Sequence, residues 1–304
     1  MFHPVIRSLT ATAACLMLLA GCAGVRRAPS EELFVSRDLT APKSFTSGVE
    51  GPAVDSDGNL YAVNFARQGT IGVVTPDGKA SVFVELPAGS VGNGIRFGKN
   101  GDMFIADYKR HNILRVDMKS RAIGVLAHEP TMNQPNDVAI DARGTLFASD
   151  PDWKAGTGQI WRIDRDGKTT RLAETQSTSN GIEVDWARNI LYVGESRSQK
   201  IWAYDLSRAG EISNKRLLID FKDKFSMDGM RCDRRGNLYV TRNGKGTIAI
   251  VSPEGGILRE VQLIGRKPTN ITFGGRDGRT CYVTMADRGN IESFRADTPG
   301  QTYR

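Results

Sequence analysis

The stretch RRGNLYVT, residues 234–241, carries the pattern on which the fold depends: a tight turn, an apolar residue, an aromatic residue, then small or β-branched residues. The pattern occurs six times, in DGNLYAVN (57–64), NGDMFIAD (100–107), ARGTLFAS (142–149), ARNILYVG (187–194), RRGNLYVT itself and DGRTCYVT (277–284). The six aromatics are spaced by 43, 43, 45, 47 and 43 residues. A period near 45 residues made only of short strands predicts a six-bladed β-propeller.

Each period holds further strands that alternate apolar and polar residues. The strand with the aromatic is the second of its repeat. A third strand follows it, as in TIGVVTPDG (70–78), and then a fourth, as in KASVFVEL (79–86). Four antiparallel strands per repeat make one blade. The last repeat lacks its fourth strand, and the N-terminal segment ELFVSRDLT (32–40) is left over. We expect this segment to complete the sixth blade and so remove an exposed sheet edge. The sequence therefore predicts an all-β propeller over residues 32–304.

The N-terminus resembles a bacterial lipoprotein signal. A basic start ending at Arg7 precedes an apolar stretch, too short to span a bilayer comfortably, and the tetrapeptide LAGC that ends at Cys22. The resemblance implies that residues 1–21 are a signal peptide and that Cys22 takes a lipid. Residues 22–31 have the composition of a tether. We therefore expect a lipid-anchored protein of the bacterial cell envelope.

The net charge bears on the protein's binding partners, and the cysteine content bears on disulfide formation. The net charge of +7 is moderate and the basic residues are scattered, whereas nucleic-acid-binding proteins gather them on one face. We therefore expect no nucleic-acid partner. A small-molecule substrate and a monomeric state are separate expectations, which the charge does not decide. Beyond the signal and the lipidated Cys22, only Cys232 and Cys281 remain, and an envelope compartment is compatible with either a disulfide or two buried thiols.

One polar residue opens the innermost strand of every repeat. These residues stand 11 or 12 positions before the aromatics and are Glu50, Asn93, Asn136, Asn180, Asp228 and Asn270. The starts of six innermost strands meet at one end of a propeller's axis, and carboxylate and amide oxygens are the ligands that Ca²⁺ prefers. Two carboxylates would neutralise a divalent charge. The alternative is that Asn and Asp occur here only because they suit the preceding turn.

These stretches resemble the gluconolactonase and senescence marker protein (regucalcin) family of six-bladed propellers. The matching motifs are Glu50-Gly51-Pro52, Pro135-Asn136-Asp137, Ser179-Asn180-Gly181-Ile182, Met227-Asp228-Gly229-Met230 and PTNITFGG (268–275). The resemblance covers about residues 32–304. It implies that Glu50, Asn180 and Asp228 bind one divalent cation, and that Asn136 binds the metal or the substrate. Calcium is the expected ion, with Zn²⁺, Mn²⁺ and Mg²⁺ as alternatives.

The resemblance also implies lactone or ester hydrolysis. Asp228 is then a metal ligand and the general base for water, and Asn93, Gln134, Asn136 and Asn270 are expected to contact substrate. Some sugar lactonases of the family have Arg where this chain has Gln134, which makes a lactone with fewer hydroxyls, or another ester, as good a candidate as gluconolactone.

Two questions stay open at this point. The first is the identity of the base. Four further acids could share this role or serve as turn residues: Asp107, Asp137, Asp150 and Glu195.

The second is whether the protein is an enzyme. The rival function is a lipid-anchored, non-catalytic propeller that binds a glycan, a peptide or an envelope protein, since propellers host both functions.

Overall fold

The computed structural model describes residues 1–3 and 32–301, and all of its regular secondary structure is β-strand. Residues Glu32–Arg304 form one compact unit. The lipoprotein signal and Cys22 lie outside the described residues. Among the residues described, no helix has the length and apolar character that crossing a bilayer requires.

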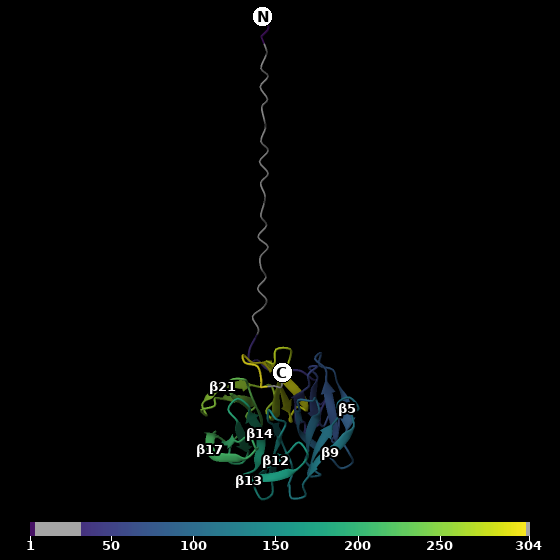
Figure 1. Cartoon of the computed structure of the whole chain (residues 1–304), viewed down its shortest axis with the longest axis vertical. Coiled ribbons are helices and arrows are strands. Elements are labelled where there is room, and N and C mark those ends of the chain that lie inside the picture. Colours follow the sequence, from purple (N-terminus) through teal and green to yellow (C-terminus); the bar gives the residue numbers. More distant parts are fainter. Residues whose placement is uncertain (4–31, 302–304) are drawn as a thin grey trace. The chain divides into compact units, whose positions relative to one another are not determined.

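Within the described residues, twenty-four strands pair into six antiparallel four-stranded sheets. These sheets are the blades of the propeller, and Figure 1 shows how they are arranged. The first three blades are β2 (Ala53–Val54), β3 (Leu60–Val63), β4 (Thr70–Val74) and β5 (Ala80–Glu85); β6 (Gly92–Phe97), β7 (Met103–Asp107), β8 (Asn112–Val116) and β9 (Ile123–His128); and β10 (Val138–Ile140), β11 (Leu146–Asp152), β12 (Thr157–Ile163) and β13 (Thr169–Thr175). The next two are β14 (Ser179–Asp185), β15 (Ile190–Glu195), β16 (Lys200–Leu206) and β17 (Ile212–Asp220); and β18 (Ser226–Cys232), β19 (Leu238–Asn243), β20 (Thr247–Val251) and β21 (Ile257–Gln262). The sixth is β22 (Pro268–Gly274), β23 (Thr280–Met285), β24 (Asn290–Arg295) and β1 (Arg37–Asp38).

The N-terminal strand closes the ring as the sequence predicts. β1 pairs with β24, so the sixth blade takes three strands from the end of the chain and one from its beginning. The predicted strand is longer than the two residues that pair. Asp38 adds an ion pair to Arg288 of the last blade, at 2.5 Å between Oδ1 and Nη1. Closure by distant segments protects the edge of the sixth sheet.

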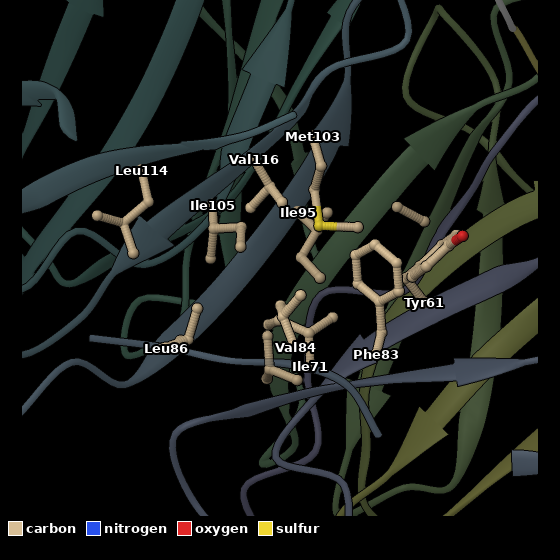
Figure 2. Close-up of a cluster of buried hydrophobic side chains, with 12 residues drawn as sticks. Tyr61, Ile71, Phe83, Val84, Leu86, Ile95, Met103, Ile105, Leu114 and Val116 are labelled. Atoms are coloured by element: carbon tan, nitrogen blue, oxygen red, sulfur yellow. The ribbon is translucent and has the colours of Figure 1, made fainter. Parts of the chain in front are cut away.

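The hydrophobic core lies between blades. Each of six buried clusters combines side chains of two neighbouring blades, and the last of them joins blade six to blade one through Tyr282, Ile291 and Leu60. Figure 2 shows the cluster between the first two blades, where Tyr61 and Phe83 meet Ile95 and Met103. The repeated aromatic thus fixes the spacing of adjacent sheets.

Both cysteines within the propeller are buried free thiols. Cys232 packs between blades four and five, and Cys281 between blades five and six. Burial raises the pKa of both thiols well above its usual range, so they behave as apolar core residues. The sequence leaves open a disulfide or two buried thiols, and the structure has the two thiols.

Neighbouring innermost strands contact one another around the whole ring, from β2 through β6, β10, β14 and β18 to β22 and back. All six strands run the same way along the axis. Their first residues therefore gather at one end of the central channel and their last residues at the other. This arrangement places the six polar residues of the repeats at a common end.

Candidate metal centre

The structure brings Glu50, Asn180 and Asp228 together at the predicted end of the channel. The carboxyl group of Asp228 lies within hydrogen-bonding reach of both Asn180 and Glu50. Burial, with the charge of Asp137 next, raises the pKa of Glu50, and burial with the charge of Glu50 raises that of Asp228. Two carboxyl groups so close together are unfavourable when both are ionised, unless a cation lies between them.

The side-chain amide of Asn180 lies against Asp228 and is held in one orientation. Its Nδ2 donates a hydrogen bond to Ser196 Oγ at 2.9 Å, and Ser196 Oγ donates in turn to the backbone oxygen of Met227 at 2.8 Å. This chain fixes the orientation of the amide. Asn180 Oδ1 is buried and has no hydrogen-bond partner among the described residues. Because an unpaired buried acceptor is costly, this oxygen has the environment of a metal ligand.

Asn93 and Asn136 lie beside these three residues at the starts of β6 and β10. Asn136 accepts at its backbone oxygen from Gly94 N at 2.8 Å, which joins blades two and three. Within the part of the chain that the structure describes, neither side-chain amide has a hydrogen bond, so both are free to bind an ion or a substrate. Gln134 lies just before Asn136, and its side chain and that of Trp153 contact the hydroxyl of Tyr108.

Asn270 has a different position from the other five. In five blades the residue that pairs with the repeated aromatic lies three positions after the predicted ligand: Ala53, Arg96, Ala139, Glu183 and Arg231. In the sixth blade Tyr282 pairs with Thr272, so the equivalent of the other five is Thr269 and not Asn270. The reason is a longer turn before the aromatic in this blade. Thr269 Oγ1 donates to Val49 O at 2.7 Å and so links blade six to blade one.

Asn270 instead belongs to a second layer, one residue deeper in the channel. The other members of this layer are Gly51, Gly94, Asp137, Gly181 and Gly229. Asn270 Nδ2 donates to Glu50 Oε2 at 2.9 Å and to Asp137 Oδ2 at 3.3 Å. Only 1% of its surface is exposed, so it is screened from a substrate. It supports the polar ring above it, which consists of Glu50, Asn93, Asn136, Asn180 and Asp228.

The four glycines of the second layer leave room for its two side chains. A Cβ added at Gly94 would lie 2.5 Å from Asp137 Oδ1, and one added at Gly229 would lie 2.0 Å from Asn270 Cγ. At Gly51 and Gly181 it would meet the neighbouring backbone at 2.1 and 2.3 Å. The channel is therefore filled by one carboxylate and one amide beneath the ring.

A third layer holds charged residues that the repeat pattern does not predict. Arg96 Nη2 pairs with Glu183 Oε2 at 3.2 Å and its Nη1 lies 3.3 Å from Asp137 Oδ1. Arg231 Nη1 lies 3.5 Å from Asp137 Oδ2. Both guanidinium groups are buried. A charged residue opposite an aromatic, on an otherwise apolar strand, was the sequence signal that could have identified them.

The net charge of the channel is equal and opposite to that of a divalent cation. The four acids are Glu50, Asp137, Glu183 and Asp228, and the two bases are Arg96 and Arg231, so the ionised set has a net charge of −2. Within residues 1–3 and 32–301 no three His, Cys, Asp or Glu side chains are grouped to hold a metal. A cation at the ring would therefore depend on Asn180 Oδ1 as well as two carboxylates, and this donor set suits a hard cation.

The other acids that the sequence singles out hold loops. Asp150 accepts from the backbone N–H groups of Asn133 and Gln134 at 2.8 and 2.6 Å, and Asp107 from Ser90 Oγ at 2.7 Å. Glu195 accepts from Ser198 Oγ at 2.7 Å. These contacts position the segments around the metal centre. Asp137 is buried between the two arginines, whereas Glu50 and Asp228 are only partly buried.

The six-bladed fold agrees with the comparisons to known proteins. Residues 48–287 match the model of the SMP-30/gluconolactonase/LRE-like region, and the chain belongs to this family. It is 25% identical to a gluconolactonase of Zymomonas mobilis over 88% of this chain and 84% of that protein. It is 26% identical to diisopropyl-fluorophosphatase of Loligo vulgaris over 84% and 90% of the two chains. The structure described as a calcium-binding regucalcin from Agrobacterium tumefaciens superposes with a TM-score of 0.78, at 21% identity, over 89% and 98%.

Proposed function

We propose that this protein is a divalent-metal-dependent hydrolase of lactones, with calcium as the ion. The observation that carries the proposal is the buried, unpartnered Asn180 Oδ1 beside the carboxyl groups of Glu50 and Asp228. The resemblance to a gluconolactonase supports the substrate class. A cation held by these residues would polarise the lactone carbonyl and stabilise the negative charge that develops on its oxygen.

The side chains of the ring then have separate tasks. Glu50, Asn180 and Asp228 hold the ion, and Asn93 and Asn136 are available to orient the lactone. The Asp228 carboxylate accepts a proton from the attacking water. Asn270 and Ser196 keep Glu50 and Asn180 in place through the hydrogen bonds described above.

Gln134 bears on which lactone is hydrolysed. Its backbone N–H is held by Asp150, so its side chain extends from a fixed point next to Asn136 toward Tyr108. Some sugar lactonases of the family have arginine at this position, and an amide offers fewer hydrogen-bond donors to ring hydroxyls than a guanidinium group does. We therefore infer that neutral lactones with few hydroxyl groups are hydrolysed at least as well as gluconolactone.

Chelation is the direct test of the proposed function. Protein treated with EGTA is expected to lose lactone hydrolysis by about 10²-fold or more and to recover it with Ca²⁺. The assay should compare gluconolactone, an unsubstituted γ-lactone and a phosphotriester, because one relative is a fluorophosphatase. Absence of calorimetric Ca²⁺ binding would favour the non-catalytic propeller. Turnover that survives chelation would contradict the metal dependence.

We also propose that Cys22 carries a lipid and anchors the protein to a membrane of the bacterial cell envelope. The support is the basic start, apolar stretch and LAGC motif of residues 1–22. The expressed full-length chain is expected to enter the detergent phase of a Triton X-114 separation, and the Cys22→Ser chain the aqueous phase. Equal partition of the two chains would refute the anchor.

A further inference from the structure

A cavity occupies the end of the channel that lies opposite the candidate metal centre. Its volume is about 980 Å³, within the range of small-molecule sites. The ends of the innermost strands and the turns after them line it, including Val54, Phe97, Ile140, Cys232 and Gly274. Because the predicted ligands stand at the starts of the same strands, the layer of Asp137 and Asn270 separates the cavity from the ring.

The inner end of this cavity is formed by the third layer of the channel. Arg96, Glu183 and Arg231 all line it, and each is more than nine-tenths buried. The guanidinium of Arg96 has acidic partners in Glu183 and Asp137. Asp137 lies within 3.5 Å of Arg231 as well, so the two arginines and the two acids together are neutral when all four are ionised.

Arg231 has unused hydrogen-bonding capacity. Its Nη1 donates to Met230 O at 2.7 Å and to Asn270 Oδ1 at 3.3 Å. Its Nη2 is buried and, among the residues described, has no hydrogen-bond partner. An unpaired buried donor on a charged group is costly, and a carboxylate is the ligand whose geometry best matches a guanidinium.

The walls above this floor include aromatic side chains among polar and charged ones. Tyr61, Phe83, Phe97 and Trp186 line the cavity. At the rim, Arg115 lies 2.5 Å from the carboxylate of Asp102, and Asp117 accepts from Ser120 Oγ at 2.9 Å, so these acids are already bound. Aromatic faces provide apolar contact for the body of a ligand whose charged end reaches the floor.

We propose that this cavity binds a small organic carboxylate with an aromatic or apolar body, its carboxylate accepting a hydrogen bond from Arg231 Nη2 and its body lying against the aromatic side chains of the walls. The site is separate from the metal centre and does not depend on the proposed hydrolase activity. Recognition combines a single negative charge with apolar surface.

Calorimetry with 2-naphthoate and its uncharged analogue 2-naphthylmethanol tests the charge requirement. The Ca²⁺-loaded protein is expected to bind naphthoate at least about tenfold more tightly than the alcohol, because only the carboxylate pairs with the guanidinium. Equal affinity for the two compounds, or no binding of naphthoate, would overturn the proposal.

Variants then locate the site. Arg231→Met is expected to weaken naphthoate binding about tenfold or more, whereas Arg208→Met, which removes an exposed arginine outside the cavity, leaves it unchanged. Asp228→Asn should also leave it unchanged, which distinguishes the cavity from direct binding to the metal. Met118→Trp, which fills the cavity from a half-buried turn far from Arg231, is expected to weaken binding even if Arg231→Met fails to fold. Unchanged affinity in Met118→Trp and in a folded Arg231→Met would refute the site.

Discussion

Replacing Asp228 with asparagine is expected to abolish lactone hydrolysis while making the calcium-free protein more stable. The loss of activity follows from the two tasks that we propose for the carboxylate, which are to hold the ion and to accept the proton from water. A general base alone contributes about 10²–10⁴-fold, so a decrease of about 10³-fold or more in kcat/KM is expected. The amide of asparagine keeps the shape of the side chain, which separates this effect from a change of packing.

The gain in stability follows from the pKa shift of Asp228. Burial, and then the charges of Glu50 and Asp137, raise its pKa in the folded protein. For an acid whose pKa is raised by folding, the ionised form destabilises the folded state, and stability is lost as pH rises through the folded pKa. At neutral pH the uncharged amide removes this penalty. Each kcal/mol gained raises the melting temperature by about 2–4 °C in a protein of this size.

Calcium should reverse the order of the two proteins. A ligand that binds only the folded state stabilises it, so Ca²⁺ is expected to raise the melting temperature of the unsubstituted protein and to leave that of Asp228→Asn nearly unchanged. Asp205→Asn is the matched control, since Asp205 pairs with Arg216 on the exposed part of β16. Its activity and its response to Ca²⁺ should not change. Full turnover in Asp228→Asn would contradict the assignment of this residue.

The sequence predicts the blades well because their signal is repeated. Six aromatics at a nearly constant spacing, each following a turn, identify the second strand of every blade, and the leftover N-terminal segment predicts the closure by β1. The grouping of Glu50, Asn180 and Asp228 follows from the same repeat. A ring of strand starts has only one geometry once the number of blades is known.

The sequence predicts the interior of the channel less well because that interior depends on register and not on pattern. Counting back from Tyr282 places Asn270 with the other ring residues, but the longer turn of the sixth blade shifts it one layer deeper. A shift of one residue sends a side chain to a different layer of the channel. Arg96 and Arg231 occupy equivalent positions in blades two and five, and the partners that neutralise them come from other blades, which no local pattern reveals.

Replacing Gly229 with alanine is expected to destabilise the propeller and weaken calcium binding together. The added Cβ would lie 2.0 Å from Asn270 Cγ, so the Asn270 side chain has to move. Overpacking of this kind costs about 1–3 kcal/mol, and loss of the Asn270 hydrogen bonds to Glu50 and Asp137 adds about 1–3 kcal/mol. A decrease of about 2–6 kcal/mol in the free energy of unfolding is therefore expected, measured by denaturant titration.

Calcium affinity should fall in the same variant because Asn270 holds Glu50 in the ring. Loss of a hydrogen bond to a metal ligand typically weakens binding about 10–100-fold, which calorimetry would measure on the folded fraction. Gly124→Ala on β9 is the matched control, since a Cβ at Gly124 meets nothing within 4 Å. Both variants make the same chemical change, so only a difference between them reports the close contact. If Gly229→Ala proved as stable as Gly124→Ala, with calcium affinity intact, Asn270 could not be the support that holds Glu50 toward the ion.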